Sequence, residues 1–128
     1  MKHHVLILDD EADVRSAIRL QLKDTRFEVL EAENVEQAMA LLGDNPISID
    51  VIVCDVRMPG VSGVEAVATF VREYPNTPVI VLTGFPDVDL AVDFMKKKDV
   101  VEFLTKPVEK DKLIAAVEQA ASDRKLFE

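Results

Sequence analysis

The amino-acid sequence predicts a three-layer α/β fold, in which helices cover both faces of a parallel sheet. Short apolar segments alternate along the chain with longer segments whose apolar residues recur every three or four positions. Three of the apolar segments, 5–8, 51–54 and 79–82, are uninterrupted, which is typical of strands buried on both faces. Parallel strands that alternate with amphipathic helices predict right-handed crossovers. A chain of 128 residues suits one domain, and we expect that domain to span residues 1–128.

The first half of the chain predicts three strands and two helices. Strands are expected at 5–8, 27–32 and 51–54. A first helix is expected after this strand, because residues recur there at helical spacing, at Val14, Ala17, Ile18, Gln21 and Leu22. Asn34 followed by Gln37 resembles a capping box, and it predicts a second helix that stops at Gly43.

The second half continues the alternation. Ser62 can cap a third helix, which ends before Pro75. A fourth strand follows Pro78, and a fourth helix is expected from Pro86 onward. A fifth strand covers 101–105, and a last helix begins at about Glu109.

Composition excludes several classes of function. Fifteen basic and 24 acidic side chains give a formal net charge of -9, which argues against a nucleic-acid-binding face. The single cysteine, Cys54, excludes an internal disulfide and lies within an apolar strand. The first residues contain no apolar signal segment, and no apolar run approaches membrane-spanning length. We therefore expect a cytoplasmic protein with no membrane partner.

Polar side chains end four of the predicted strands. Asp9 and Asp10 follow the first strand, and Asp55 follows the third. Thr83 follows the fourth strand, and Lys106 follows the fifth. If the strands are parallel neighbours, these side chains meet at one edge of the sheet. With strand order 2-1-3-4-5, the first and third strands flank the reversal in strand order, where ligands bind in such sheets.

The grouped side chains have a definite chemistry. Three carboxylates held together repel one another unless a cation lies among them, and carboxylate oxygens suit Mg²⁺. A lysine and a hydroxyl beside that cation suit a phosphoryl group. A single acid at a strand end is weak evidence, because acids also cap helices there. The joint pattern favours a phosphoryl site with bound Mg²⁺.

The whole chain resembles a receiver domain of bacterial two-component response regulators. The segments that carry the resemblance are Leu8-Asp9-Asp10-Glu11, Asp55 to Gly63, Val81-Leu82-Thr83-Gly84 and Phe103-Leu104-Thr105-Lys106-Pro107. The Thr83-Gly84 and Phe103-Leu104 pairs favour the subfamily similar to nitrogen-fixation regulators. The resemblance implies a flavodoxin-like (βα)5 three-layer sandwich with sheet order 2-1-3-4-5.

The resemblance also implies roles for individual residues. Asp55 would be the phosphoacceptor. Asp10 would bind Mg²⁺ directly, Asp9 mainly through water, and Asp55 and the backbone carbonyl of Arg57 would complete the site. Lys106 would contact one phosphoryl oxygen. A cis peptide bond is implied between Lys106 and Pro107.

Thr83 and Phe103 would form the switch. By the resemblance, the Thr83 hydroxyl contacts a phosphoryl oxygen, and Phe103 takes the place of an aromatic residue that rotates inward on phosphorylation. Signal would leave through the face of the fourth helix, fifth strand and last helix. The implied partners are a sensor histidine kinase or a histidine phosphotransfer protein, and then an effector or a second copy of the chain. Arg26 and Asp99 replace common glycines of the family, so both loops are expected to differ locally.

Two other classes of function remain as alternatives. A haloacid-dehalogenase-like phosphatase also uses a strand-end aspartate with Mg²⁺, but it carries a second acid two residues later, where this chain has Arg57. A receiver-like scaffold typically lacks an acid or the lysine, and this chain has all of them. We therefore predict a signalling module rather than an enzyme, one that catalyses no more than its own phosphoryl transfer and dephosphorylation. It would be a stand-alone receiver or a fragment of a longer regulator.

Overall fold

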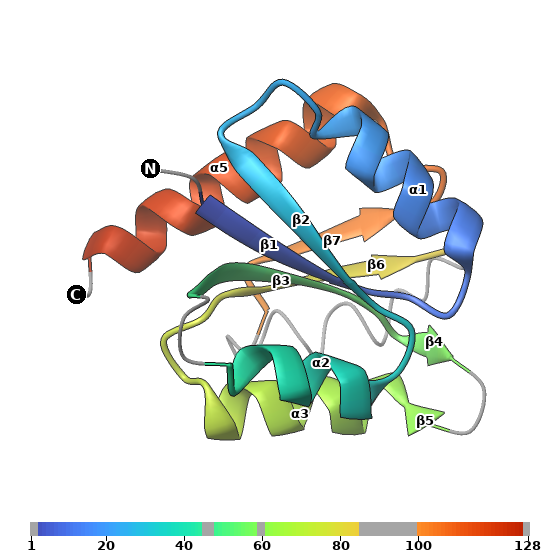
Figure 1. Ribbon diagram of the computed structural model, residues 1–128, viewed down its shortest axis with the longest axis vertical. Coiled ribbons are helices and arrows are strands. Elements are labelled where there is room, and N and C mark those ends of the chain that lie inside the picture. Colours follow the sequence, from blue (N-terminus) through green and yellow to red (C-terminus); the bar gives the residue numbers. More distant parts are fainter. Residues whose placement is uncertain (1–2, 45–47, 59–60, 85–99, 127–128) are drawn as a thin grey trace.

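A five-stranded parallel sheet forms the centre of the computed structural model, which describes residues 3–44, 48–58, 61–84 and 100–126. The strand order is β2-β1-β3-β6-β7 (Figure 1). The bounds are β1 His3–Leu8, β2 Phe27–Ala32, β3 Ile49–Asp55, β6 Val79–Thr83 and β7 Glu102–Thr105. Because β6 and β7 are the fourth and fifth strands of this sheet, the predicted order 2-1-3-4-5 is confirmed.

Helices cover both faces of the sheet and complete the three predicted layers (Figure 1). Helices α1, Ala12–Gln21, and α5, Lys110–Leu126, lie on one face. Helices α2, Val35–Leu42, and α3, Gly63–Glu73, lie on the other. The helix expected from Pro86 onward lies outside the described residues. Among the described helices, none combines the length and the apolar character needed to cross a membrane.

The strands fill two separate cores because successive side chains of a strand point to opposite faces. In β1, Val5 and Ile7 pack with Ile18, on the α1 and α5 side. Leu6 and Leu8 pack on the other side, with Phe70 of α3. All four β1 side chains are fully buried. This double burial explains why the strand is apolar at every position from Val5 to Leu8 and not at alternate ones.

The capping of α2 agrees with the sequence, with one change in detail. The Asn34 side chain accepts a hydrogen bond from the Gln37 backbone N–H at 2.8 Å, as predicted. The Gln37 side chain accepts in turn from the backbone N–H of Glu33 at 2.9 Å, one residue earlier than in a capping box. Gly43 ends the helix in a right-handed conformation, with φ at -83°.

Two loops show features that the sequence pattern did not predict. Arg57–Met58 and Val61–Ser62 form the short antiparallel pair β4-β5. In the loop before β2, the left-handed residue is Asp24, with φ at 65°, and not Arg26. Arg26 instead pairs with Glu118 of α5 at 2.6 Å and lies over the Phe27 ring. Asp99, the other replaced glycine, lies outside the described residues.

Candidate functional site

The ends of β1 and β3 bring four carboxylates together. Leu8 and Cys54 are partners in the parallel ladder, so the residues that follow them, Asp9 and Asp55, lie side by side. Oxygen atoms of Asp9, Asp10, Glu11 and Asp55 all lie within 4.8 Å of one another. Asp9 and Asp55 are 0% and 2% exposed, whereas Asp10 and Glu11 are exposed to solvent. We call these four residues the acid cluster.

Lys106 reaches the acid cluster from the end of β7. Its Nζ lies 2.8 Å from Asp9 Oδ2, 3.1 Å from Asp55 Oδ2 and 3.4 Å from Glu11 Oε1. Burial alone would lower the pKa of Lys106, but the carboxylates of Asp9 and Asp55 outweigh burial and hold that pKa above its usual value. The ammonium is therefore charged at neutral pH. The peptide bond between Lys106 and Pro107 is cis, as the family resemblance implied.

The Asp9 carboxylate can accept a further electrophilic partner. Its Oδ1 accepts a hydrogen bond from the Glu11 backbone N–H at 2.9 Å. Its Oδ2 is buried and forms the ion pair with Lys106, but it accepts no well-directed hydrogen bond from any described residue. A buried carboxylate oxygen in this condition, beside other carboxylates, fits a hard divalent cation. The donor set of the acid cluster therefore suits Mg²⁺.

The other predicted site residues, Thr83, Arg57 and Phe103, lie on strands β6, β4 and β7. Thr83 ends β6, the neighbour of β3, and is fully buried. Its carbonyl accepts a hydrogen bond from the Lys106 N–H at 2.7 Å. Arg57 lies two residues beyond Asp55, in β4. Phe103 lies further back on β7, in register with Val81, and packs toward the core on the α2 and α3 side.

Two charged residues beside the acid cluster, Arg15 and Glu31, were not predicted from the sequence. Arg15 of α1 donates from Nη1 to the backbone carbonyl of Asp9 at 2.6 Å. Its Nε donates to Glu31 Oε1 of β2 at 3.1 Å. Arg19 binds the other oxygen of Glu31, at 2.7 Å. Hydrogen bonds from Arg19, joined by the charges of Arg19 and Arg15, outweigh partial burial and lower the pKa of Glu31.

Cys54 is not a nucleophile in this site, although it precedes Asp55. Its side chain is fully buried within the core on the α2 and α3 side. Burial, with smaller effects from the charges of Asp55 and Asp9, raises the pKa of the Cys54 thiol far above its usual value. The thiol is therefore neutral, and it packs as a small apolar group.

Comparison with known proteins identifies the family. Residues 5–118 match the model of the response regulator receiver domain. The chain belongs to this family. It is 37% identical over 120 residues to the transcriptional regulatory protein FixJ of Bradyrhizobium diazoefficiens. It is 35% identical over 116 residues to the hydrogenase transcriptional regulatory protein HoxA of Cupriavidus necator. These relatives confirm a receiver domain of the type found in nitrogen-fixation regulators.

The receiver covers different shares of these relatives. It matches with 93% of its own length and 57% of FixJ, and with 91% of its own length and 23% of HoxA. The chain thus spans about half of one relative and about a quarter of the other. As a receiver domain it is a signalling module of two-component systems.

Solved receiver structures share the fold over nearly the whole chain. A response regulator receiver domain protein from Clostridium thermocellum superposes with a TM-score of 0.89 at 32% identity, covering 98% of this chain and 99% of the other. The beryllofluoride-activated NtrC4 receiver domain, solved as a dimer, gives 0.84 at 30% identity, covering 94% and 98%. These similarities confirm the flavodoxin-like receiver fold.

Proposed function

We propose that this receiver is a phosphorylation-dependent switch whose phosphoacceptor is Asp55. The proposed donor is the phosphohistidine of a sensor histidine kinase or of a histidine phosphotransfer protein. One observation carries the proposal: the Asp55 carboxylate ends β3 within the acid cluster, with the Lys106 ammonium 3.1 Å from its Oδ2. A nucleophilic carboxylate, a cation site and a fixed ammonium are the parts that phosphoryl transfer to aspartate needs.

The transfer is a displacement at phosphorus. An oxygen of Asp55 forms the new P–O bond while the P–N bond to the donor histidine breaks. The electron pair of that bond returns to the imidazole nitrogen, which takes a proton from solvent. Lys106 then exchanges part of its contact with the carboxylates for a phosphoryl oxygen, to which it offers a point charge. The Thr83 hydroxyl is proposed to donate to another phosphoryl oxygen, and water later hydrolyses the acyl phosphate.

Mg²⁺ would be held by Asp10, Asp55, the Arg57 carbonyl and, mainly through water, Asp9. The proximity of the acid-cluster oxygens and the buried Asp9 Oδ2 support this assignment. When bound, Mg²⁺ supplies positive charge that neutralises the phosphoryl oxygens during transfer. The protein's own part is to hold the carboxylates close together in spite of their mutual repulsion, with Lys106 as a compensating charge.

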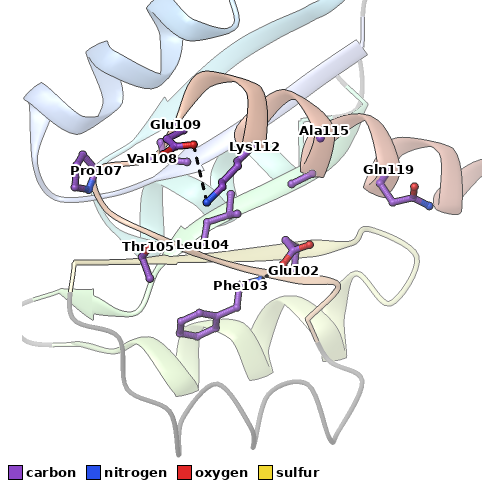
Figure 2. Close-up of a pocket in the computed structure, with 11 residues that line it drawn as sticks. Glu102, Phe103, Leu104, Thr105, Pro107, Val108, Glu109, Lys112, Ala115 and Gln119 are labelled. Carbon is purple, nitrogen blue, oxygen red and sulfur yellow. Dashed lines mark hydrogen bonds and ion pairs between the residues drawn. The ribbon is translucent and has the colours of Figure 1, made fainter.

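The signal is proposed to leave through the face formed by β7 and α5. A pocket of about 600 Å³ lies here. Side chains of both elements line it (Figure 2). Phe103 and Leu104 point to opposite sides of β7 (Figure 2). Strand β7 forms one wall of the pocket, so a movement of Phe103 would change the shape of that wall. An effector or a second copy of the chain would bind this face. The activated NtrC4 receiver is itself a dimer, which supports association between copies.

Intact-mass measurement with acetyl phosphate and Mg²⁺ tests the phosphoacceptor directly. The wild-type chain should gain one phosphoryl group, and Asp55→Asn should gain none, because an amide of nearly the same shape is not a nucleophile. Asp111→Asn, which removes an exposed acid at the start of α5, is the matched control and should label normally. Full labelling of Asp55→Asn would overturn the assignment, and failure of the wild type to label would favour the receiver-like scaffold.

A further inference from the structure

We infer that Arg15 is a positioning residue for the metal site: its guanidinium fixes the Asp9–Asp10 peptide and thereby aims the Asp10 carboxylate into the acid cluster. This inference rests on the proposed function of the acid cluster. It adds a residue that lies outside the motifs of the resemblance and that binds neither the metal nor the phosphoryl group.

The contact with the backbone is short and charged. Arg15 Nη1 donates to the Asp9 carbonyl at 2.6 Å, and the Arg15 side chain is 13% exposed. Hydrogen bonds from a guanidinium are about twice as strong as those between neutral groups. The carbonyl oxygen belongs to the peptide group that joins Asp9 to Asp10, so the bond sets the orientation of that group. The Cα of Asp10 is the far end of the same planar unit.

Asp10 needs such a constraint more than its neighbours do. Asp9 and Asp55 are buried and contact Lys106, so packing and charge hold their side chains. Asp10 is exposed, and packing does little to restrict it. Its position therefore depends on the backbone from which its side chain starts. Fixing the peptide before Asp10 reduces the conformational entropy that cation binding would otherwise cost.

Glu31 in turn fixes Arg15. The carboxylate is on the second-last residue of β2, and it accepts from Arg15 Nε at 3.1 Å. Arg19 occupies its other oxygen, with Nε at 2.9 Å and Nη2 at 2.7 Å. The lowered pKa of Glu31 keeps this carboxylate ionised at neutral pH. Strand β2 thus supports the guanidinium through Glu31, and the guanidinium supports the turn between β1 and α1.

The charge of Arg15 makes the inference sharply testable. Removing a positive charge next to four carboxylates should, by Coulomb attraction alone, strengthen the binding of a cation. Removing a positioning group should weaken it. Loss of an outer contact of a metal site typically costs 10- to 100-fold in affinity, so we expect the Mg²⁺ dissociation constant of Arg15→Ala to rise about tenfold.

The experiment is an Mg²⁺ titration without any phosphodonor, at a temperature where circular dichroism shows every variant folded. Arg19→Ala is the matched control, because Arg19 binds the same Glu31 but does not contact the Asp9 carbonyl in the structure. It should change the dissociation constant much less than Arg15→Ala does. Arg15→Met keeps the apolar stem and removes the donors, so it replaces Arg15→Ala if that variant does not fold, with the same expectation.

A second measurement needs no metal. In the Mg²⁺-free protein, Arg15→Ala should shift the carbonyl carbon resonance of Asp9 and the amide nitrogen resonance of Asp10, because both atoms belong to the affected peptide. Arg19→Ala should leave both close to their wild-type values. A merely structural role of Arg15 would lower the melting temperature without this local effect.

The outcomes separate the inference from the proposed function. Asp10→Ala is measured in the same titration, and it should lose most of the Mg²⁺ affinity. If it does, and Arg15→Ala binds as tightly as the wild type or more tightly, the positioning role is wrong and the metal site stands. Equal weakening by Arg15→Ala and Arg19→Ala would also overturn it. If Asp10→Ala keeps its affinity, the proposed metal site is itself wrong, and the inference fails with it.

Discussion

Single residues of the acid cluster differ in how their charge is compensated. The buried carboxylates of Asp9 and Asp55 share the Lys106 ammonium, at 2.8 and 3.1 Å. Asp10 faces solvent and relies on water to screen its charge. The four carboxylates of the acid cluster outnumber the ammonium of Lys106, which is the basic group that the printed ion pairs of the described residues place within the cluster, so negative charge is in excess there when no metal is bound. Repulsion within the acid cluster opposes folding until a cation binds.

Asp10→Ala should weaken Mg²⁺ binding and, in the absence of metal, stabilise the fold. Two like charges 4 Å apart in water-like surroundings repel by about 1 kcal/mol, so the melting temperature should rise by about 3 °C. Thermal melts in EDTA and a parallel Mg²⁺ titration measure the two effects. Asp13→Ala, in the first turn of α1 and outside the acid cluster, is the control. An unchanged Mg²⁺ affinity would contradict the ligand role of Asp10.

Glu31→Gln should remove stability at neutral pH but not in acid. Arg19 and Arg15 lower the pKa of Glu31 below its usual 4.5. A carboxylate whose folded pKa is depressed contributes stability above its unfolded pKa and loses it as the pH falls through its folded pKa. Urea denaturation at pH 7 should therefore show that Glu31→Gln loses about 1 kcal/mol of unfolding free energy. The unfolding free energies of the variant and the wild type should converge below pH 4.5. A difference that persists at low pH would contradict this origin.

Local sequence patterns predict some secondary-structure elements well and others poorly. Uninterrupted apolar runs located the central strands, because both faces of each are buried. The strand predicted at 51–54 is shorter than β3, which extends from Ile49 to Asp55. The apolar run did not reach the end of the strand because the last residue of β3 is polar. No pattern could predict β4 and β5, because strands of two residues have no periodicity. The N-terminus of α2 was predictable because Asn34 carries its own capping group.

Asn34→Ala tests the cap of α2. Its side chain satisfies the Gln37 N–H, which has no partner within the helix, so its loss should cost about 1 kcal/mol of unfolding free energy. Chemical denaturation monitored by circular dichroism measures the change. Asn34→Asp keeps an acceptor at the same place and should be close to wild type. Equal destabilisation by the two variants would show that the cap contributes nothing through this hydrogen bond.

At the scale of the whole molecule, parallel topology gathers residues that are far apart in the chain. The grouping of Asp9, Asp55 and Lys106 could be predicted, because the carboxyl ends of neighbouring parallel strands share one edge. The contact of Arg15 with Glu31 could not, because it depends on how α1 is rotated against β2. Nor does a sequence state that Lys106 pairs with Asp9 as well as with Asp55.

Thr83→Ala should leave labelling of Asp55 largely intact and uncouple the response. Thr83 is buried at the end of β6, which lies between β3 and β7 in the sheet. A change at Asp55 on β3 can therefore reach Phe103 on β7 through Thr83. Amide chemical shifts with and without beryllofluoride should change along β7 in the wild type but not in Thr83→Ala. Thr105→Ala, at the paired position of β7, is the control. Shift changes that never leave the acid cluster, even in the wild type, would contradict the route through β7.

The Arg19 side chain has a second consequence, for the behaviour of the protein at high concentration. Strand β2 is an edge of the sheet, and an open edge is a template on which another chain can add a strand. Arg19 Nη2 donates to the Val29 carbonyl of this strand at 3.2 Å while the guanidinium holds Glu31. An incoming strand would have to break these bonds and approach the exposed carboxylate of Glu28. The Arg19 side chain, which holds Glu31 in place, thus also opposes the addition of a strand from another chain at this edge of the sheet.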